Sequence, residues 1–407
     1  MAKPVIRLKG YCGEWRTLSI GECGIWLKGK SLSKSDLQAD GAYPCIHYGE
    51  LFVLYDEVIR DVFSRTNLNS ESLSTEGDLL FPDSDVTPNG LARCSAIMKN
   101  NVVLGGGINI LRTDPQYYAP FLSFSINTEK EQIIRNVTGT TVKHINSKAL
   151  SSISLSITDD FSEQYDIAHF FESLNGLIKA AGSKVDSLKQ QKSACLLSMF
   201  PQDGETVPRI RFKGFQDDWQ STPLREISKK VTKKNKDLLY KTTFTNSAQF
   251  GIIDQLDFFD HEISKSERIN NYYVVENDDF VYNPRISTSA PVGPINRNQL
   301  GYTGVMSPLY YVFRVFGIDK DFLSCYFKTT IWHKFMRDNG NSGARFDRLS
   351  IADDVFVKMP ILHPKDPEEQ RMIASFFRNL DTQISLHQQR LEKLKQIKSA
   401  CLDKMFV

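Results

Sequence analysis

The feature that most constrains this chain is an internal repeat that is confined to particular segments. Residues 188–200 (LKQQKSACLLSMF) recur at 394–406 (LKQIKSACLDKMF), with ten identities in thirteen positions at an offset of 206. A second match, at an offset of 204, relates Arg7–Trp15 to Arg211–Trp219, the openings of the two halves. Similarity ends between these anchors, from about 30 to 135 and from about 234 to 338. The sequence therefore predicts two variable units, each followed by a constant segment.

The constant segments carry apolar residues in alternating steps of four and three, from Ile167 to Met199 and from Ile373 to Met405. This spacing predicts two long helices with a seam along which they pack lengthwise. Acid-rich stretches at 159–163 and 366–369 favour helix starts, and Pro201 ends the first helix. A seam of about 33 residues corresponds to roughly 50 Å of helix. Two such helices can pair with each other and hold the variable units apart at a fixed separation.

The alternative is that each helix packs only on its own domain, a role that does not need near-identical sequences. Lys192 and Lys398 interrupt the seam at matching places, and a polar seam residue sets register or marks where another helix docks. Gly176 and Gly182 weaken the first helix and could kink it. The residues predicted to form the coiled coil or dock partners are Ile167, Phe171, Leu174, Ile178, Leu188, Lys192, Ile373, Phe377, Leu380, Ile384, Leu391, Leu394 and Lys398.

The variable segments are rich in β-branched and aromatic residues, broken by Gly, Pro and Asn, with short helical stretches between them. Such a pattern predicts mixed α/β domains of about 150 residues, which places the chain in the α/β class. The expected organisation is a first domain at 1–157, a central helical segment at 158–201, a second domain at 202–363 and a C-terminal helical segment at 364–407.

Related turns end the two variable units, at 138–145 and 342–349, with Gly139 and Gly343 aligned at the offset of 204. The residues that follow differ in their donors and acceptors, as reading of base edges requires, although drift in a surface loop gives the same pattern. A second candidate lies at 282–288, where Arg285 could meet a guanine or a phosphate. The predicted DNA-binding residues are Thr140, Thr141, Lys143, His144, Arg285, Ser287, Thr288, Arg345, Asp347 and Arg348.

Charge divides unevenly between the halves. The whole chain has a net charge of +2, but residues 1–205 carry −4 and residues 206–407 carry +6. The second half includes a basic stretch, 225–241, that is either a solvated face or a surface for phosphates. The chain has no apolar run long enough for a membrane helix and no cleavable signal at its start. Its seven cysteines include no CxxC pair, which favours a reducing, cytoplasmic setting.

Several motifs of catalysis are missing. The sequence has no GxxxxGK[ST] phosphate loop and no Asp/Asn-Pro-Pro-aromatic tetrapeptide, and the glycines at 105–107 lack the spacing of a dinucleotide fingerprint. His47, near Glu50 and Asp56, is only a weak metal candidate. We therefore predict no catalytic residue and no metal site in this chain.

The arrangement resembles the specificity subunit of type I restriction-modification systems across essentially the whole chain. The residues that carry the resemblance are the openings at Arg7–Trp15 and Arg211–Trp219, the turn at Gly139–Asn146 and the repeated helix ends. The resemblance implies two target-recognition domains, each reading one half of a bipartite, asymmetric site in double-stranded DNA. It also implies that the two helices pair as an antiparallel coiled coil and set the spacing. The first helix departs from the second where Asn175 stands opposite Asp381.

The resemblance further implies a non-catalytic subunit of a cytoplasmic prokaryotic complex, without a cofactor of its own. Two methylation subunits, which use S-adenosylmethionine to modify adenine N6, would dock near the helices. Two restriction subunits, which use ATP and Mg²⁺, would join the full complex. One alternative is a duplicated scaffold that binds proteins and has no sequence-dependent affinity for DNA. Another is an unrecognised nuclease or methyltransferase, whose purified chain would cleave or methylate DNA without any partner.

Overall fold

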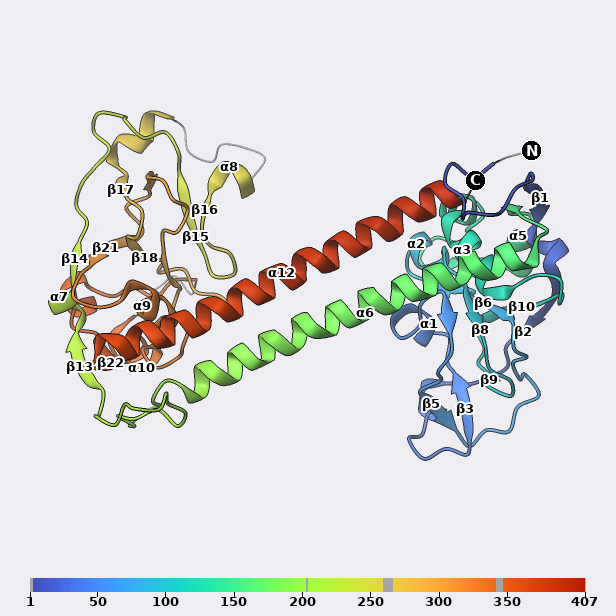
Figure 1. Cartoon of the computed structure of the whole chain (residues 1–407), viewed down its shortest axis with the longest axis horizontal. Coiled ribbons are helices and arrows are strands. Elements are labelled where there is room, and N and C mark those ends of the chain that lie inside the picture. Colours follow the sequence, from blue (N-terminus) through green and yellow to red (C-terminus); the bar gives the residue numbers. More distant parts are fainter. Residues whose placement is uncertain (1–2, 203, 259–265, 342–346, 407) are drawn as a thin grey trace. The chain divides into compact units, whose positions relative to one another are not determined.

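The computed structural model describes residues 3–202, 204–258, 266–341 and 347–406 (Figure 1). The chain divides into two compact units, each of which takes its residues from two places in the sequence. Unit 1 comprises residues 1–183 and 388–407, and unit 2 comprises residues 184–387. Each unit therefore contains an α/β domain, part of one long helix and part of the other.

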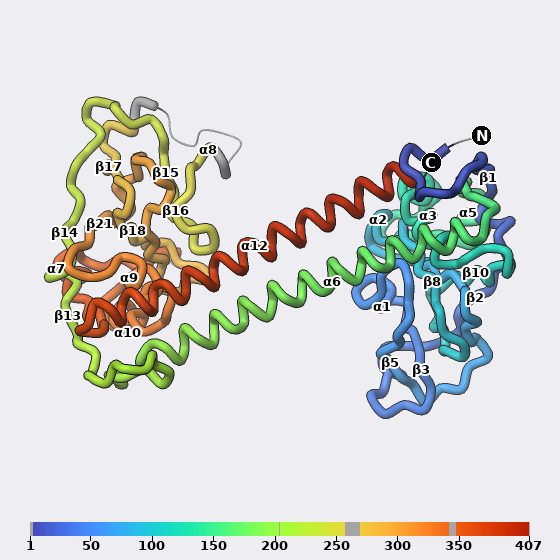
Figure 2. The backbone as a smooth tube through the Cα atoms, in the orientation of Figure 1, coloured from blue at the N-terminus to red at the C-terminus, as the bar shows by residue number. Residues whose placement is uncertain are grey.

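Unit 1 is built on a five-stranded sheet of order β2-β10-β6-β8-β4, in which only the β4–β8 pair is parallel. A three-stranded sheet of order β5-β3-β9 forms an extension of this unit away from α3, as the backbone trace shows (Figure 2). Two short pairs, β1-β12 and β11-β7, complete the domain. The strands are β1 (Arg16–Ser19), β2 (Gly24–Lys28), β3 (Tyr43–Ile46), β4 (Val58–Ile59), β5 (Ser64–Thr66), β6 (Asp78–Pro82), β7 (Ser84–Asp85), β8 (Ser95–Ile97), β9 (Val103–Leu104), β10 (Ile108–Thr113), β11 (Lys143–His144) and β12 (Ser154–Ile157).

The core of unit 1 forms where α3 and the long helices cover this sheet. Phe121 and Phe124 of α3 are fully buried there, with Leu79 and Phe81 of β6. Strand β6 is buried at all five positions, as expected for the middle strand of a covered sheet. The helices of the domain are α1 (Glu50–Val53), α2 (Pro88–Leu91), α3 (Ala119–Thr128), α4 (Lys130–Arg135) and α5 (Ser147–Ser151).

Unit 2 is built on a four-stranded antiparallel sheet of order β14-β21-β18-β19, with three two-stranded pairs, β13-β22, β15-β16 and β17-β20. Its core is unusually aromatic, with Phe280, Phe313 and Phe322 fully buried. The strands are β13 (Gln220–Pro223), β14 (Ser228–Lys230), β15 (Phe244–Ser247), β16 (Gly251–Asp254), β17 (Tyr273–Val275), β18 (Phe280–Tyr282), β19 (Ile295–Arg297), β20 (Gly304–Met306), β21 (Tyr311–Val315) and β22 (Pro360–His363). The helices are α7 (Leu224–Ile227), α8 (Gln255–Phe258), α9 (Lys320–Tyr326), α10 (His333–Asn339) and α11 (Asp353–Phe356).

The two constant segments form long helices, α6 (Phe161–Ser198) and α12 (Pro367–Met405). Glu163 lies in the first turn of α6, and Glu368 and Glu369 lie in the first turn of α12, where carboxylates favour a helix start. Helix α6 continues without interruption through Gly176 and Gly182.

The helices pair antiparallel, as the resemblance implied. In unit 1, Phe171 near the start of α6 contacts Phe406, which follows the end of α12. In unit 2, Lys192 near the end of α6 contacts Asp381 in the first half of α12. Most predicted seam residues are buried, including Ile167, Leu174, Leu188, Ile373, Leu380 and Ile384, whereas Ile178, Leu391 and Leu394 are half-buried.

Candidate nucleic-acid interface

The predicted turn of the first domain is a tight hairpin whose polar side chains face solvent. Thr138 and His144 exchange two backbone hydrogen bonds, of 3.0 and 2.8 Å. Gly139 has a φ of +98°, and a Cβ there would lie 2.1 Å from the carbonyl oxygen of Val142. The turn therefore requires glycine. It presents the exposed side chains of Thr140, Thr141 and His144 on a fixed backbone.

Lys143 differs from its neighbours in this turn. Its ammonium donates a 2.8 Å hydrogen bond to the carbonyl oxygen of Gly139, and its side chain is only half exposed. Strand β11, which it begins, pairs with β7 and so ties the turn to the domain. Lys143 can therefore stabilise the turn in the free protein. To contact a phosphate, its ammonium would have to break the hydrogen bond to Gly139.

In the second domain, two segments predicted separately come together. The backbone bridge between Arg285 and Arg348 joins them, and the amide of Ile286 donates to the carbonyl oxygen of Asp347 at 3.0 Å. The Arg285 Nε lies 3.9 Å from the Asp347 carboxylate. Two arginines on adjacent backbones can contact successive phosphates or base edges.

The other predicted residues of this segment are placed as follows. Ser287 and Thr288 are exposed, and the Ser287 hydroxyl accepts a 3.2 Å hydrogen bond from the amide of Ala290. Arg345 lies outside the described residues. Unit 2 thus presents a basic edge around Arg285 and Arg348, to which the predicted basic stretch adds Lys230 and Lys234. Lys230 pairs with Asp353, and the Lys234 ammonium lies 3.5 Å from the centre of the Tyr273 ring.

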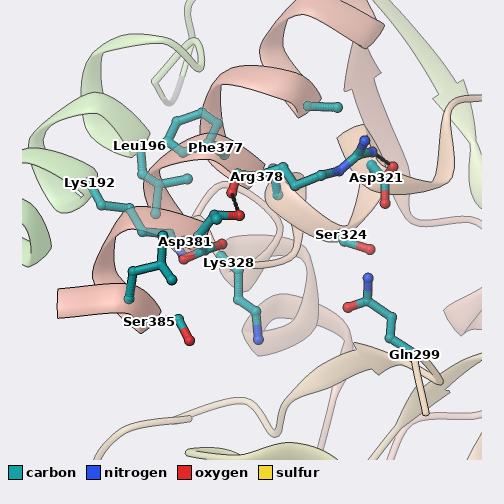
Figure 3. A pocket seen from close by; sticks show the side chains of 14 residues that line it. Lys192, Leu196, Gln299, Asp321, Ser324, Lys328, Phe377, Arg378, Asp381 and Ser385 are labelled. Atoms are coloured by element: carbon teal, nitrogen blue, oxygen red, sulfur yellow. Dashed lines mark hydrogen bonds and ion pairs between the residues drawn. The ribbon is translucent and has the colours of Figure 1, made fainter. Parts of the chain in front are cut away.

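The matching seam lysines make different ion pairs in the two units. Lys192 pairs with Asp381 of α12 at 2.5 Å, at the edge of a cavity of about 440 Å³ that Figure 3 shows. Lys398 pairs at 2.5 Å with Glu57, a residue of the first domain. The Asn175 amide donates to the same carboxylate at 2.9 Å. Asn175 occupies the position of α6 that corresponds in the repeat to Asp381 of α12. Glu57 of the first domain therefore supplies the carboxylate that α6 lacks at this position.

Glu57 is held ionised in this arrangement. Burial alone would raise the pKa of the Glu57 carboxyl, but the Lys398 ammonium and the Asn175 amide outweigh burial and lower its pKa. Glu57 belongs to a variable segment and matches no residue of the second half, so the repeat could not identify it as the partner of Lys398. The only trace of it in the sequence is the replacement of the helix carboxylate by Asn175.

Equivalent aromatic clusters secure the far end of each helix. In unit 1, the Phe406 ring lies 6.2 Å from Trp15, 5.5 Å from Phe121 and 5.8 Å from Phe171. In unit 2, the Phe200 ring lies 5.7 Å from Trp219, 5.6 Å from Phe322 and 6.1 Å from Phe377. The repeated Met-Phe helix ends and the repeated tryptophans therefore form one structural unit.

The arginines of the repeated openings are also structural. Arg7 makes two hydrogen bonds to Glu163, of 2.6 and 2.7 Å, and Arg211 makes two to Glu369, of 2.7 and 2.8 Å. Both carboxylates are buried. Each opening thus clamps the first turn of the long helix that follows its own domain.

No cluster of three or more potential metal ligands occurs in the part of the chain that the structure describes. The imidazole Nδ1 of His47 accepts a 3.1 Å hydrogen bond from the amide of Gly49. None of the described helices is both long enough and apolar enough to span a membrane.

Comparisons with known proteins agree with this architecture. A family model described as the type I restriction modification DNA specificity domain matches twice, over residues 13–188 and 216–396. A crystal structure of a type I restriction-modification S subunit from M. genitalium is similar, with a TM-score of 0.62 and 14% identity over 100% of this chain and 99% of that one. A chain from a structural study of complex assembly and conformational transition in the type I R-M system has a TM-score of 0.51 and 15% identity, over 96% and 97%. Among curated proteins, none matches this sequence.

Proposed function

The chain belongs to the family of type I restriction modification DNA specificity domains, and we propose that each of its units reads one half of a bipartite, asymmetric DNA site. The observation that carries the proposal is that the specificity domain matches twice, once on each side of α6. A protein scaffold without DNA recognition is not favoured, because the matching family is defined by DNA specificity.

In this proposal the chain performs no catalysis. Its partners are two methylation subunits that bind S-adenosylmethionine and methylate adenine N6, and in the full complex two restriction subunits that use ATP and Mg²⁺. The absence of a phosphate loop and of the methyltransferase tetrapeptide supports this division of labour. The seven cysteines carry free thiols, which suits a reducing cytoplasm as the setting.

The helices would set the distance between half-sites and provide the docking surface for the methylation subunits. Exposed apolar side chains support this role, because Leu177, Leu197 and Leu386 lie on the outer faces of α6 and α12. A partner helix that packed on these faces would remove the apolar groups from water.

Sequencing of adenine methylation in cells with and without this chain tests the proposed function. We expect one bipartite motif to be methylated only when the chain and its partners are present. Arg285→Ala should abolish or relax recognition of one half-site, and Thr141→Ala that of the other, since each contact lies in one unit. Methylation of the same motif without this chain, or a motif that stays intact in both variants, would contradict these assignments.

A further inference from the structure

A cavity of about 440 Å³ lies in unit 2 beside the paired arginines. Aromatic side chains line much of it, among them Tyr273, Tyr310 and Tyr311. Three charged residues, Lys230, Asp353 and Arg348, also line it. A mainly apolar cavity of this size with a few convergent polar groups is typical of a site for a small organic molecule or group.

The walls are fixed by packing that does not depend on a ligand. The Tyr311 ring lies 4.7 Å from Phe356, and Tyr282 stacks on the same ring at 5.1 Å. The Tyr282 hydroxyl is within hydrogen-bond distance of the carbonyl oxygens of Val292 and Leu349, at 3.1 and 3.2 Å. The Tyr310 hydroxyl lies 3.1 Å from that of Thr245. A cavity formed in this way loses little entropy when it is filled.

The polar groups offer both a donor and an acceptor. Lys230 forms an ion pair with Asp353, and its ammonium lies 5.0 Å from the centre of the Tyr311 ring. The Nε of Arg348 is buried and has no hydrogen-bond partner among the described residues. Its nearest carboxylate oxygen, from Asp347, is 3.9 Å away. The site can thus accept a hydrogen bond, donate one and face a negative charge.

These properties select the chemical class of the ligand. A nucleobase is planar, stacks on tyrosine and carries donors and acceptors on one edge. Its phosphate would meet Arg348, which lines the cavity, and Arg285, whose backbone is bridged to that of Arg348. An aromatic side chain of a protein could stack equally well, but it would leave the arginines without an anion.

We propose that this cavity takes one unstacked base of the bound DNA, held between tyrosines with its edge on the Lys230–Asp353 pair. The proposal rests on the proposed function, since it requires DNA at unit 2. Extruding a base from a duplex sacrifices its stacking and pairing, and a cavity that accepts one base in preference to others would contribute specificity at one position of the half-site.

The first experiment needs no knowledge of the target sequence. The deoxynucleoside monophosphate of 2-aminopurine is titrated into the full-length chain, and binding is followed by quenching of its fluorescence. We expect saturable quenching, at least tenfold weaker in Asp353→Asn and unchanged in Asp354→Asn. The neighbouring Asp354 is a matched control, because it pairs at 3.8 Å with Lys358 and does not line the cavity. Absence of quenching, or equal loss in both variants, would overturn the proposal.

The second experiment distinguishes a base of DNA from a free nucleotide. The target duplex, once identified, carries 2-aminopurine at successive positions of the half-site read by unit 2 and is bound by the complex with its methylation subunits. We expect a change in fluorescence at one position only, lost in Asp353→Asn and kept in Asp354→Asn. Quenching of the mononucleotide with no such position would reject a DNA base as the ligand. Tighter binding of N-acetyltryptophanamide than of the mononucleotide would reject a nucleobase altogether.

The two proposals can fail separately. If the chain confers no sequence-specific methylation, the proposed function fails, whereas the mononucleotide titration still reports on the cavity. If methylation depends on the chain but no probe enters the cavity, only the present inference fails.

Discussion

At the scale of single residues, the duplication shows how a lost charge is replaced. Asp381 supplies the carboxylate for Lys192 from within the helix pair, whereas Asn175 at the equivalent position has no charge and Glu57 provides it from the domain. The Lys398 and Glu57 side chains are 20% and 17% exposed, so the pair is shielded from solvent more than a surface ion pair is. Removing one partner should therefore be costly.

We expect Glu57→Gln to lower the free energy of unfolding by about 1–3 kcal/mol, because it leaves the Lys398 ammonium partly buried without a carboxylate. Adding Asn175→Asp should recover most of the loss, since it places a carboxylate where unit 2 has one. Denaturant unfolding of the wild type, the single variant and the double variant measures both effects. Asp381→Asn is the matched change in unit 2, and a rescue of that variant by Asn175→Asp would refute the pairing.

The same carboxylate gives a pH dependence whose sign follows from its lowered pKa. A carboxyl group whose pKa is lowered in the folded state, as that of Glu57 is, stabilises the fold at pH values above the unfolded pKa of about 4.3 that is usual for glutamate. That stabilisation is lost as the pH falls through the folded pKa. The difference in stability between wild type and Glu57→Gln should therefore be constant near neutral pH and shrink below about pH 4, as unfolding at a series of pH values would show.

At the scale of elements, the two aromatic clusters anchor the far end of each helix. Phe406→Ala should cost about 3–5 kcal/mol, because it removes a ring that is only 7% exposed from a cluster of three others. The loss should appear as faster amide hydrogen exchange in residues 390–405, with the amides of unit 2 unaffected. Phe200→Ala is the internal control and should have the converse effect, on residues 184–198. Equal exchange in both regions of either variant would argue against local anchoring.

The glycines of α6 provide a test of opposite sign. Beyond the adjoining residues and the backbone of α6 itself, a Cβ at Gly176 or Gly182 would meet no atom of the described residues within 4 Å, and neither position requires a positive φ. Alanine at either position should stabilise the helix by about 0.5–1 kcal/mol by lowering the entropy of the unfolded chain. Thermal unfolding checks this. A destabilised variant would show that these positions contact a residue or partner that the structure does not describe.

The helices and the domains were not equally predictable from sequence. The seam is a local pattern, so Phe171, Leu188 and Phe377 could be assigned to a buried face from their spacing alone. Arg285 and Arg348 lie 63 positions apart and meet only because the fold bridges their backbones. The cavity beside them draws on at least four separate segments. No spacing rule in one sequence could have brought these residues together.

At the scale of the whole molecule, the repeat accounts for the near-zero net charge that obscured DNA binding in the composition. A net charge of +2 is the sum of −4 over residues 1–205 and +6 over residues 206–407, so charge is divided unevenly along the chain. Helix α6 begins in unit 1 and ends in unit 2, and α12 begins in unit 2 and ends in unit 1. Each long helix therefore has one end in each unit.

The proposed role of the helices in setting the spacing makes their length a determinant of the DNA target. Deleting one heptad from α6 and one from α12 shortens each helix by about 10 Å while retaining the seam, because seven residues restore the a/d pattern. At about 3.4 Å for each base pair, the spacer of the methylated motif should shorten by about three base pairs with both half-sites unchanged. Methylation sequencing of cells that carry the variant measures spacer and half-sites together. Deleting a heptad from α6 alone is the control and should abolish methylation, since the aromatic clusters at the helix ends could no longer both form. An unchanged spacer with altered half-sites would show that the helices position partners and do not measure DNA.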